Sequence, residues 1–195
     1  MKKILLLISQ GTELFEIAPF TDVFGWNNII NNDKILLKTC SFHSKIDSVW
    51  NLQIIPEIDL SKESINISDF DALVIPGGFG YKGFFTDMKL QEFNNIILHF
   101  IKNNKIITGI CTGVLTIGEA KGLIGRKATT YLYDNERYFK QLTYYGAIPI
   151  KKPIVVDNNL ITVSGPKNAI DAAFMLLKIL TSEENVQRVK YNMCF

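Results

Sequence analysis

The stretch "ITGICTGVLTIGEA", residues 107–120, carries the strongest indication of the fold. An apolar, β-branched run leads into the sequence G-x-C-x-G, from Gly109 to Gly113, and a helix-like run follows it. Small residues two positions before and after a central residue allow a strand to turn tightly into a helix. The pattern therefore predicts a strand, a sharp turn that presents Cys111, and a helix.

The rest of the chain repeats this alternation of strand and helix. Short apolar runs predict buried strands, and apolar residues at helical spacing predict helices. The expected strands are residues 2–9, 34–42, 49–58, 71–78, 105–110 and 126–130, with a hairpin over 153–165, and the expected helices are 12–28, 88–104, 112–123, 134–142, 168–180 and 182–193. This order is typical of an α/β fold with a mostly parallel sheet covered on both faces. Because no linker or repeat interrupts it, we expect one domain over residues 1–195.

Composition and charge exclude several classes of function. The chain has 21 basic and 19 acidic residues and no basic stripe, so a nucleic acid is not an expected partner. The longest apolar stretch near the N-terminus, residues 4–8, is too short to span a membrane, and we expect a cytoplasmic protein without a membrane partner. The three cysteines form no C-x-x-C pair, which argues against a disulfide framework or a zinc site. No metal is expected.

Cys111 is the candidate nucleophile. A helix that begins directly after it presents free N–H groups and the positive end of its dipole, which favour a thiolate and predict a lowered pKa. The same N–H groups could stabilise an oxyanion. The alternative is a small buried core cysteine, and spacing alone leaves both interpretations open. Cys40 and Cys194 are expected to have no chemical role.

A glycine-rich loop, "PGGFGYKG" (76–83), follows another predicted strand. Gly78, Gly80 and Gly83 match the G-x-G-x-x-G pattern of dinucleotide-binding loops. The following helix is predicted to begin only near Asp87, and no acidic residue ends the next strand. We therefore expect no cofactor here, and interpret the segment as a loop whose backbone N–H groups point into the cleft beside Cys111.

The acidic residues of the first predicted helix have an ordinary interpretation from the residues alone. Glu13 lies near the helix start, where the dipole favours a carboxylate without any function. Glu16 lies further along and would be a solvated helix residue.

Four segments together resemble the ThiJ/PfpI superfamily, which includes the parkinsonism-linked protein deglycase and the isonitrile hydratases. They are "GTELFEIAPFTDVF" (11–24), "DALVIPGG" (71–78), "GICTGVLTIGEAKGLIGRKATTY" (109–131) and "LITVSGPKNAIDAAFMLL" (160–177). The third is the most specific and is similar to isonitrile-hydratase-like members. The resemblance covers roughly residues 3–181. It implies a flavodoxin-like three-layer sandwich of the class I glutamine amidotransferase type, and a homodimer.

The resemblance also implies site residues. Cys111 matches the family's nucleophile, and Glu16 matches the first-helix acid that contacts the cysteine sulfur, which reverses the ordinary interpretation of Glu16. A carboxyl group beside a thiolate holds its proton longer, so it can donate a hydrogen bond to sulfur and act as a general acid. Thr112 follows the cysteine as in the hydratase branch, and Gly78 would supply another oxyanion donor.

Two departures from the family pattern restrict the chemistry. The protease branch carries histidine directly after the cysteine, where this chain has Thr112, and the hydratase-like branch has histidine where this chain has Tyr131. Neither His43 nor His99 falls at a motif position. A Cys–His pair therefore lacks its base, and ordinary peptide-bond hydrolysis is not expected. Tyr131 is a possible third-position residue, but it is a poor base at neutral pH.

Two functions stay open at this stage. The first is a cysteine-dependent, amidase-like hydrolase or hydratase in which Cys111 and Glu16 act on a small electrophilic C–N or carbonyl substrate. The second is a redox or stress sensor, or chaperone, without turnover, whose oxidised cysteine is stabilised by Glu16. A DNA-binding regulator of this superfamily carries a further helix-turn-helix region, which this chain does not show.

Overall fold

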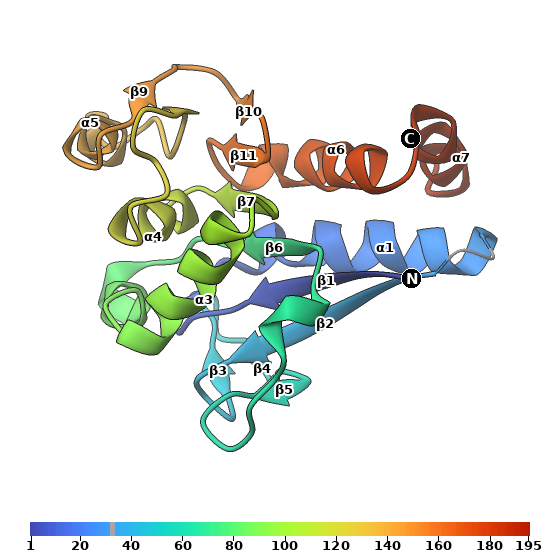
Figure 1. Ribbon diagram of the computed structural model, residues 1–195, viewed down its shortest axis with the longest axis horizontal. Coiled ribbons are helices and arrows are strands. Elements are labelled where there is room, and N and C mark those ends of the chain that lie inside the picture. The colour runs from blue at the N-terminus through green and yellow to red at the C-terminus, as the bar shows by residue number, and fades with distance from the viewer. Residues whose placement is uncertain (32–33) are drawn as a thin grey trace.

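A seven-stranded sheet forms the centre of the molecule (Figure 1). The computed structural model describes residues 1–31 and 34–195. The strand order is β10-β11-β7-β6-β1-β2-β5, and every neighbouring pair is parallel except β10 and β11. These strands are β1 (Lys2–Leu7), β2 (Ile35–Ser41), β5 (Ile58–Asp59), β6 (Ala72–Ile75), β7 (Ile106–Ile110), β10 (Ile154–Asp157) and β11 (Leu160–Val163).

Alternate residues of the strands point to opposite faces and build two apolar cores. Ile4, Leu6 and Val74 face α1 (Ala18–Ile30), α6 (Ala169–Leu180) and α7 (Glu183–Asn192). Leu5, Leu7 and Leu73 face the opposite layer, which contains α2 (Phe84–Asp87), α3 (Gln91–Lys102), α4 (Gly113–Glu119) and α5 (Arg137–Tyr144). The result is the three-layer α/β sandwich that the sequence predicted. Figure 1 shows α1 and α6 lying along each other on one face.

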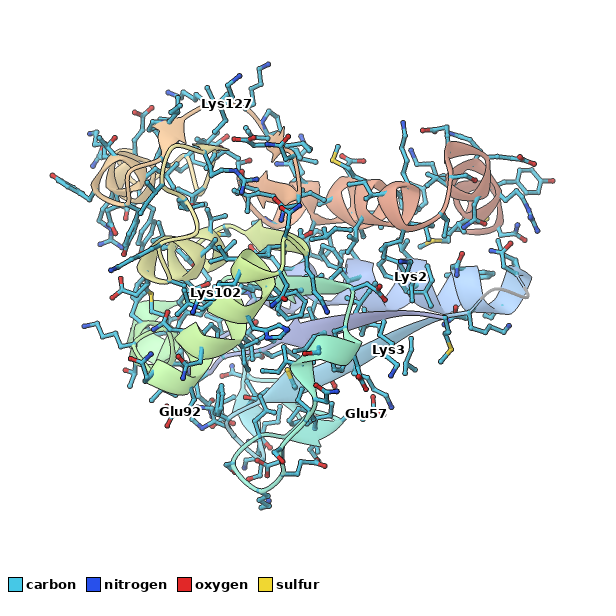
Figure 2. The ribbon with its side chains drawn as sticks, viewed as in Figure 1. Lys2, Lys3, Glu57, Glu92, Lys102 and Lys127 are labelled. Atoms are coloured by element: carbon cyan, nitrogen blue, oxygen red, sulfur yellow. The ribbon has the colours of Figure 1, made fainter. Side chains whose placement is uncertain are left out.

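Two short pairs of strands lie outside this sheet, one antiparallel and one parallel. β3 (Ile46–Asp47) and β4 (Gln53–Ile54) form a hairpin, so that only β4 lies within residues 49–58, which were predicted as one short strand. β8 (Lys127–Ala128) pairs with β9 (Ile148–Pro149). Charged side chains such as Glu92, Lys102 and Lys127 lie on the outside (Figure 2). No helix in the described part of the chain is long and apolar enough to cross a bilayer.

Several predicted helices begin or end elsewhere in the structure. The run 12–28 divides into a 3₁₀ turn, η1 (Leu14–Glu16), and α1, because Ile17 and Pro19 form the start of the longer helix. The helix predicted over 112–123 ends at Glu119, since Lys121 adopts a left-handed φ of 63°. The helix predicted over 134–142 begins at Arg137, because residues 134–136 all have positive φ. Ser182 caps α7, because its side-chain oxygen accepts the Asn185 N–H.

Candidate active site

The candidate site lies at the carboxyl ends of three adjacent strands, β1, β6 and β7. In parallel α/β sheets this edge is where ligands bind. The loop after β1 carries Glu16, the loop after β6 carries Gly77 and Gly78, and the turn after β7 carries Cys111. The first two loops pair with each other, because the Phe79 N–H donates to the carbonyl oxygen of Gly11 at 2.9 Å. Three segments that are distant in sequence are thus brought to one place.

Cys111 occupies a strained backbone conformation at the turn from β7 to α4. Its φ is +52°, in the left-handed region that non-glycine residues seldom adopt. The surrounding structure holds it there: the Cys111 N–H donates to Val163 O at 2.8 Å, and the Thr130 hydroxyl donates to Cys111 O at 2.5 Å. The predicted sharp strand-to-helix turn is therefore present, and the side chain is half-buried.

Gly113 allows α4 to approach the neighbouring strand. A β-carbon at this position would overlap the carbonyl oxygen of Ile75 and would lie 2.8 Å from that of Pro76. Gly109 is packed similarly, since a β-carbon there would lie 2.7 Å from Cδ1 of Ile117. Packing against backbone thus requires Gly113, whereas the closest contact at Gly109 is with the end of a side chain.

Glu16 ends the 3₁₀ turn η1 and is fully buried. Its Oε2 atom accepts a hydrogen bond of 2.6 Å from the Gly77 N–H. Its Oε1 atom has no hydrogen-bond partner among the described residues, and the Cys111 thiol interacts with the carboxyl group. Burial raises the pKa of Glu16 to about 8, against the lowering effect of the Gly77 hydrogen bond. Glu16 therefore keeps its proton at neutral pH.

The pKa of the Cys111 thiol is raised, whereas the sequence pattern predicted that it would be lowered. Burial raises its pKa well above the ordinary value, and negative charge on Glu16 would raise it further. The Thr112 N–H lowers it, as a helix start should, but this effect is smaller than that of burial. The predicted lowering was wrong because the sequence pattern does not show how much water the turn excludes. At neutral pH the site thus holds protons on both the thiol and the carboxyl group.

Thr112 and Gly78 contact each other, and the Thr112 side chain also interacts with Cys111. The Gly78 N–H donates to Thr112 Oγ1 at 2.9 Å, and that hydroxyl donates to Gly78 O at 2.8 Å. The Thr112 N–H points toward the Cys111 sulfur. The oxyanion donor that this structure presents most directly is therefore the backbone of Thr112, whereas the Gly78 N–H already has a partner.

Tyr131 lies close enough to Cys111 for the two groups to interact. Burial, and then the charge of Cys111, raise the pKa of the Tyr131 phenol, so it holds its proton more firmly than usual. Its ring also contacts Tyr133 and Tyr138, at centroid distances of 5.8 and 6.4 Å. Tyr131 can donate a hydrogen bond into the site but does not replace the missing base.

The two histidines have other partners in the described structure. His43 contacts both oxygens of the buried Asp87 carboxylate, at 2.9 and 3.0 Å from Nε2. The second of these oxygens also accepts the Gln10 N–H at 2.8 Å. His99 lies in α3, with Ser68 Oγ at 3.5 Å. His43 and Asp87 thus connect the loops around the site through hydrogen bonds, but they are not part of the site.

Sequence reasoning missed the pair formed by Glu13 and Trp50. The Trp50 indole N–H donates to both Glu13 carboxylate oxygens, at 3.1 and 3.0 Å. Glu13 borders the site, since its charge contributes to the raised pKa of Glu16. The two residues are 37 positions apart, and no local pattern connects them.

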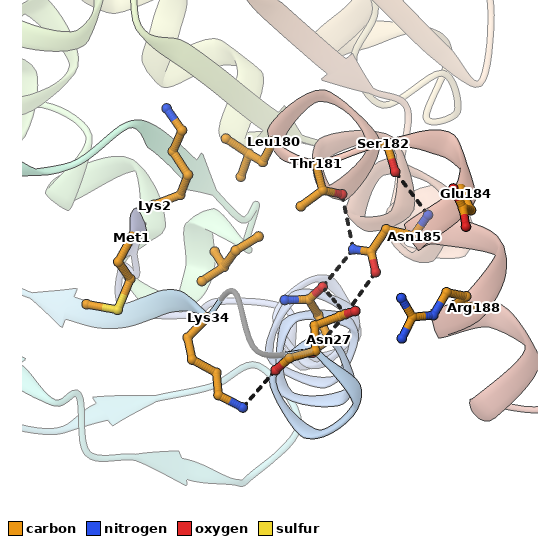
Figure 3. A pocket seen from close by; sticks show the side chains of 12 residues that line it. Met1, Lys2, Asn27, Lys34, Leu180, Thr181, Ser182, Glu184, Asn185 and Arg188 are labelled. Atoms are coloured by element: carbon orange, nitrogen blue, oxygen red, sulfur yellow. Dashed lines mark hydrogen bonds between the residues drawn. The ribbon is translucent and has the colours of Figure 1, made fainter.

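A large cleft lies elsewhere, at the amino ends of β1 and β2 (Figure 3). Its volume is about 740 Å³, and its charged lining residues are Lys2, Lys34, Glu184 and Arg188. Two of these cations hydrogen-bond to carbonyl oxygens at the end of α1: Lys34 to Asn28 and Asn31, and Arg188 to Ile30. Figure 3 shows Asn27 and Asn185 linked beside them. These contacts stabilise a helix terminus and are separate from the candidate site.

The sandwich and the cysteine turn define a protein of the class I glutamine amidotransferase-like fold. The family model described as DJ-1/PfpI family, also called ThiJ/PfpI, matches residues 2–179. The chain therefore belongs to the DJ-1/PfpI family.

Two relatives illustrate the range of the family. Isonitrile hydratase from Pseudomonas putida is 33% identical over 120 residues, which cover 62% of this chain and 50% of that protein. Protein dj-1beta from Drosophila melanogaster is 23% identical over 188 residues, 96% of this chain and 94% of the relative. This chain matches about half the length of the first curated relatives.

Solved structures show the same fold at low sequence identity. The crystal structure of Drosophila melanogaster DJ-1beta has a TM-score of 0.82 at 23% identity and covers 99% of this chain and 97% of its own. Schizosaccharomyces pombe DJ-1 has a TM-score of 0.81 at 22% identity, with 99% of each chain covered. The predicted fold class is confirmed.

Proposed function

We propose that this protein is a cysteine-dependent, amidase-like hydrolase or hydratase that acts on a small electrophilic C–N or carbonyl carbon. The observation that carries the proposal is the buried Glu16 carboxyl group, with its pKa of about 8, beside the Cys111 thiol on a strained turn. A carboxyl group that keeps its proton at neutral pH can act as a general acid. The thiol is the group in the site that can form a covalent bond.

Hydration of an isonitrile illustrates how this pair would work. The Cys111 sulfur adds to the terminal carbon while Glu16 gives its proton to that carbon and takes up the thiol proton, forming a thioimidate. Water then adds to the same carbon, and the C–S bond breaks. The products are an N-substituted formamide and the regenerated Cys111 thiol. Because the thiol proton leaves during attack, the raised pKa of Cys111 is compatible with this route.

Backbone donors and Tyr131 would complete the site. The Thr112 N–H, at the start of α4, would hold developing negative charge. The Gly78 N–H would join it only after the Thr112 hydroxyl released it. Tyr131 would donate a hydrogen bond to the substrate or to the attacking water.

Replacing Cys111 by alanine is expected to abolish turnover, because the covalent bond to substrate cannot form. Replacing Glu16 by glutamine should lower kcat by roughly 100-fold or more, the usual range for a lost general acid. We would measure turnover of cyclohexyl isocyanide, of benzamide and of methylglyoxal. Cys194→Ala is the matched control, since Cys194 is exposed at the other end of the chain and should leave the rate unchanged.

An unchanged rate in Cys111→Ala on a substrate that the wild-type protein converts would refute the proposal. Circular dichroism of each variant would confirm that the fold is retained.

A second candidate is a redox sensor or chaperone that shows no turnover. It is favoured by the half-buried position of Cys111 beside a carboxyl group that can hydrogen-bond to an oxidised sulfur. One experiment distinguishes the two candidates. Wild-type protein is tested for turnover and is then treated with peroxide. A sensor converts no substrate and gains two oxygen atoms at Cys111 faster than at Cys194. Site-resolved mass spectrometry gives the readout.

The remaining expectations from the sequence are part of the same proposal. We propose a homodimer that acts on a small molecule in the cytoplasm, with residues 1–195 as one domain. Light scattering in solution gives the molar mass, to be compared with 22.1 kDa for one chain.

A further inference from the structure

The backbone of Cys111 is held on both sides of its α-carbon. Its N–H donates to Val163 O at 2.8 Å, and its carbonyl oxygen accepts the Thr130 hydroxyl at 2.5 Å. The angles φ and ψ are rotations of the two planar peptide groups that flank an α-carbon. Each hydrogen bond therefore restrains one of these rotations, and together they hold Cys111 at its left-handed φ of +52°.

The Thr130 hydroxyl is the closer of the two donors that the structure describes at the Cys111 carbonyl oxygen. The other donor is the Val114 N–H, in the first turn of α4, at 3.3 Å. Thr130 is fully buried, so water does not compete for its hydroxyl. Its hydrogen bond lies at the short end of the usual range for an O–H donor. The Thr130 side chain thus supplies a restraint on ψ that the helix makes less closely.

Strand β11 fixes Thr130 relative to the cysteine turn. The Thr129 N–H donates to Thr162 Oγ1 on β11 at 3.0 Å, and Val163, the next residue of that strand, accepts the Cys111 N–H. β11 is also the parallel neighbour of β7, the strand that leads into the turn (Figure 1). The hydroxyl is therefore placed by a strand of the central sheet and not by α4.

We propose that Thr130 is a positioning residue, which holds the Cys111 thiol beside the Glu16 carboxyl group by fixing the Cys111 carbonyl group. The next residue is Tyr131, whose phenol interacts with Cys111. The same hydrogen bond thus also keeps the segment that carries Tyr131 against the turn. This inference rests on the proposed function, because it concerns the nucleophile of that reaction.

Thr130→Val removes the hydroxyl and keeps the β-branched shape of the side chain. Without the restraint on ψ, Cys111 can leave the left-handed conformation, and its thiol moves away from Glu16 towards solvent. Because burial raises the pKa of Cys111, this movement lowers the pKa. Alkylation by iodoacetamide then becomes faster at pH 8, since the thiolate is the species that displaces iodide. A pKa lower by one unit gives about ten-fold more thiolate.

Site-resolved mass spectrometry at pH 8 follows the three cysteines of the chain in one sample. Cys194 is exposed and gives the reference rate, whereas Cys40 is fully buried and reports unfolding. In Thr130→Val the rate at Cys111 relative to Cys194 should rise about ten-fold, while Cys40 reacts as slowly as in the wild type. On a substrate that the wild-type protein converts, kcat should fall while KM changes little, because Thr130 acts through Cys111.

Two matched variants separate the effect of the hydroxyl from that of the shape. Thr130→Ser keeps a hydroxyl and should retain the wild-type rate at Cys111. Thr129→Val makes the same substitution at the preceding position. Thr129 is also fully buried, but its hydroxyl has no hydrogen-bond partner among the described residues, so the rate at Cys111 should not change.

The proposal fails on any of three results. The first is a rate at Cys111 that stays the same or falls in Thr130→Val. The second is an equal rise in Thr130→Ser, which would assign the effect to the methyl group. The third is a joint rise at Cys111 and Cys40, which would give Thr130 a role in overall stability only. These alkylation rates need no turnover, so a wild-type protein that converts no substrate would refute the proposed function and leave this test intact.

Discussion

Replacing Glu16 by glutamine is expected to flatten the dependence of protein stability on pH. In the wild-type protein the pKa of Glu16 is about 8 in the folded state and 4.5 in the unfolded chain. Because the folded pKa is raised, the unfolded chain loses its proton first. The unfolding free energy therefore decreases as the pH rises from about 4.5 to about 8, by roughly 3 to 5 kcal/mol from this residue. Glutamine cannot ionise, so this loss disappears.

Urea denaturation at pH 5 and at pH 9 measures the effect. Glu16→Gln should gain stability relative to the wild type at pH 9, although it loses activity. Glu92→Gln is the control, because Glu92 is an exposed residue of α3 (Figure 2) and should leave the difference between the two pH values as in the wild type. A Glu16→Gln protein that loses as much stability between pH 5 and 9 as the wild type would contradict the assignment of a protonated, buried Glu16.

Replacing Gly113 by alanine is expected to destabilise the protein by about 3 kcal/mol or more, a large share of the free energy of unfolding of a typical domain. The added β-carbon would overlap the backbone carbonyl of Ile75 and press against that of Pro76. Backbone of a central strand cannot move away as a flexible side chain does. The turn that carries Cys111 would be displaced, so the rate at which the Cys111 thiol reacts should change in the folded variant.

Gly25→Ala provides the opposite result on the same chain. Gly25 lies within α1, and a β-carbon there meets nothing within 4 Å. Alanine should stabilise this helix by roughly 0.5 to 1 kcal/mol, because glycine loses more conformational freedom on folding. Urea midpoints of the two variants should move in opposite directions. Equal small shifts in both would show that α4 packs less closely on β6 than the structure indicates.

The fold could be predicted because its signal is local. Strands β1, β6 and β7 are short apolar runs buried on both faces, and alternating helices require parallel pairing. Helix boundaries were less accurate where single residues adopt positive φ. Lys121 and Glu136 are residue types that rarely adopt the left-handed conformation, so their sequence does not mark it, whereas Asp134 and Asn135 tolerate it.

The candidate site could be predicted only in part. The spacing around Cys111 identified a sharp turn, because close packing of α4 requires Gly113. Glu16 was recognised only through the family resemblance, since a helical pattern treats it as solvated, whereas η1 turns it inward. The pKa of Cys111 was predicted in the wrong direction because burial depends on the whole fold. Trp50 was missed because its partner is distant in sequence.

The Asp87 carboxylate joins three loops that follow three neighbouring strands. It accepts hydrogen bonds from Gln10 after β1 and from His43 after β2, and it belongs to α2 after β6. None of these loops can open alone without breaking a contact to this one buried group. The rim of the site should therefore move as a single body, and a substrate would enter either through a gap already present or by a concerted displacement of all three segments.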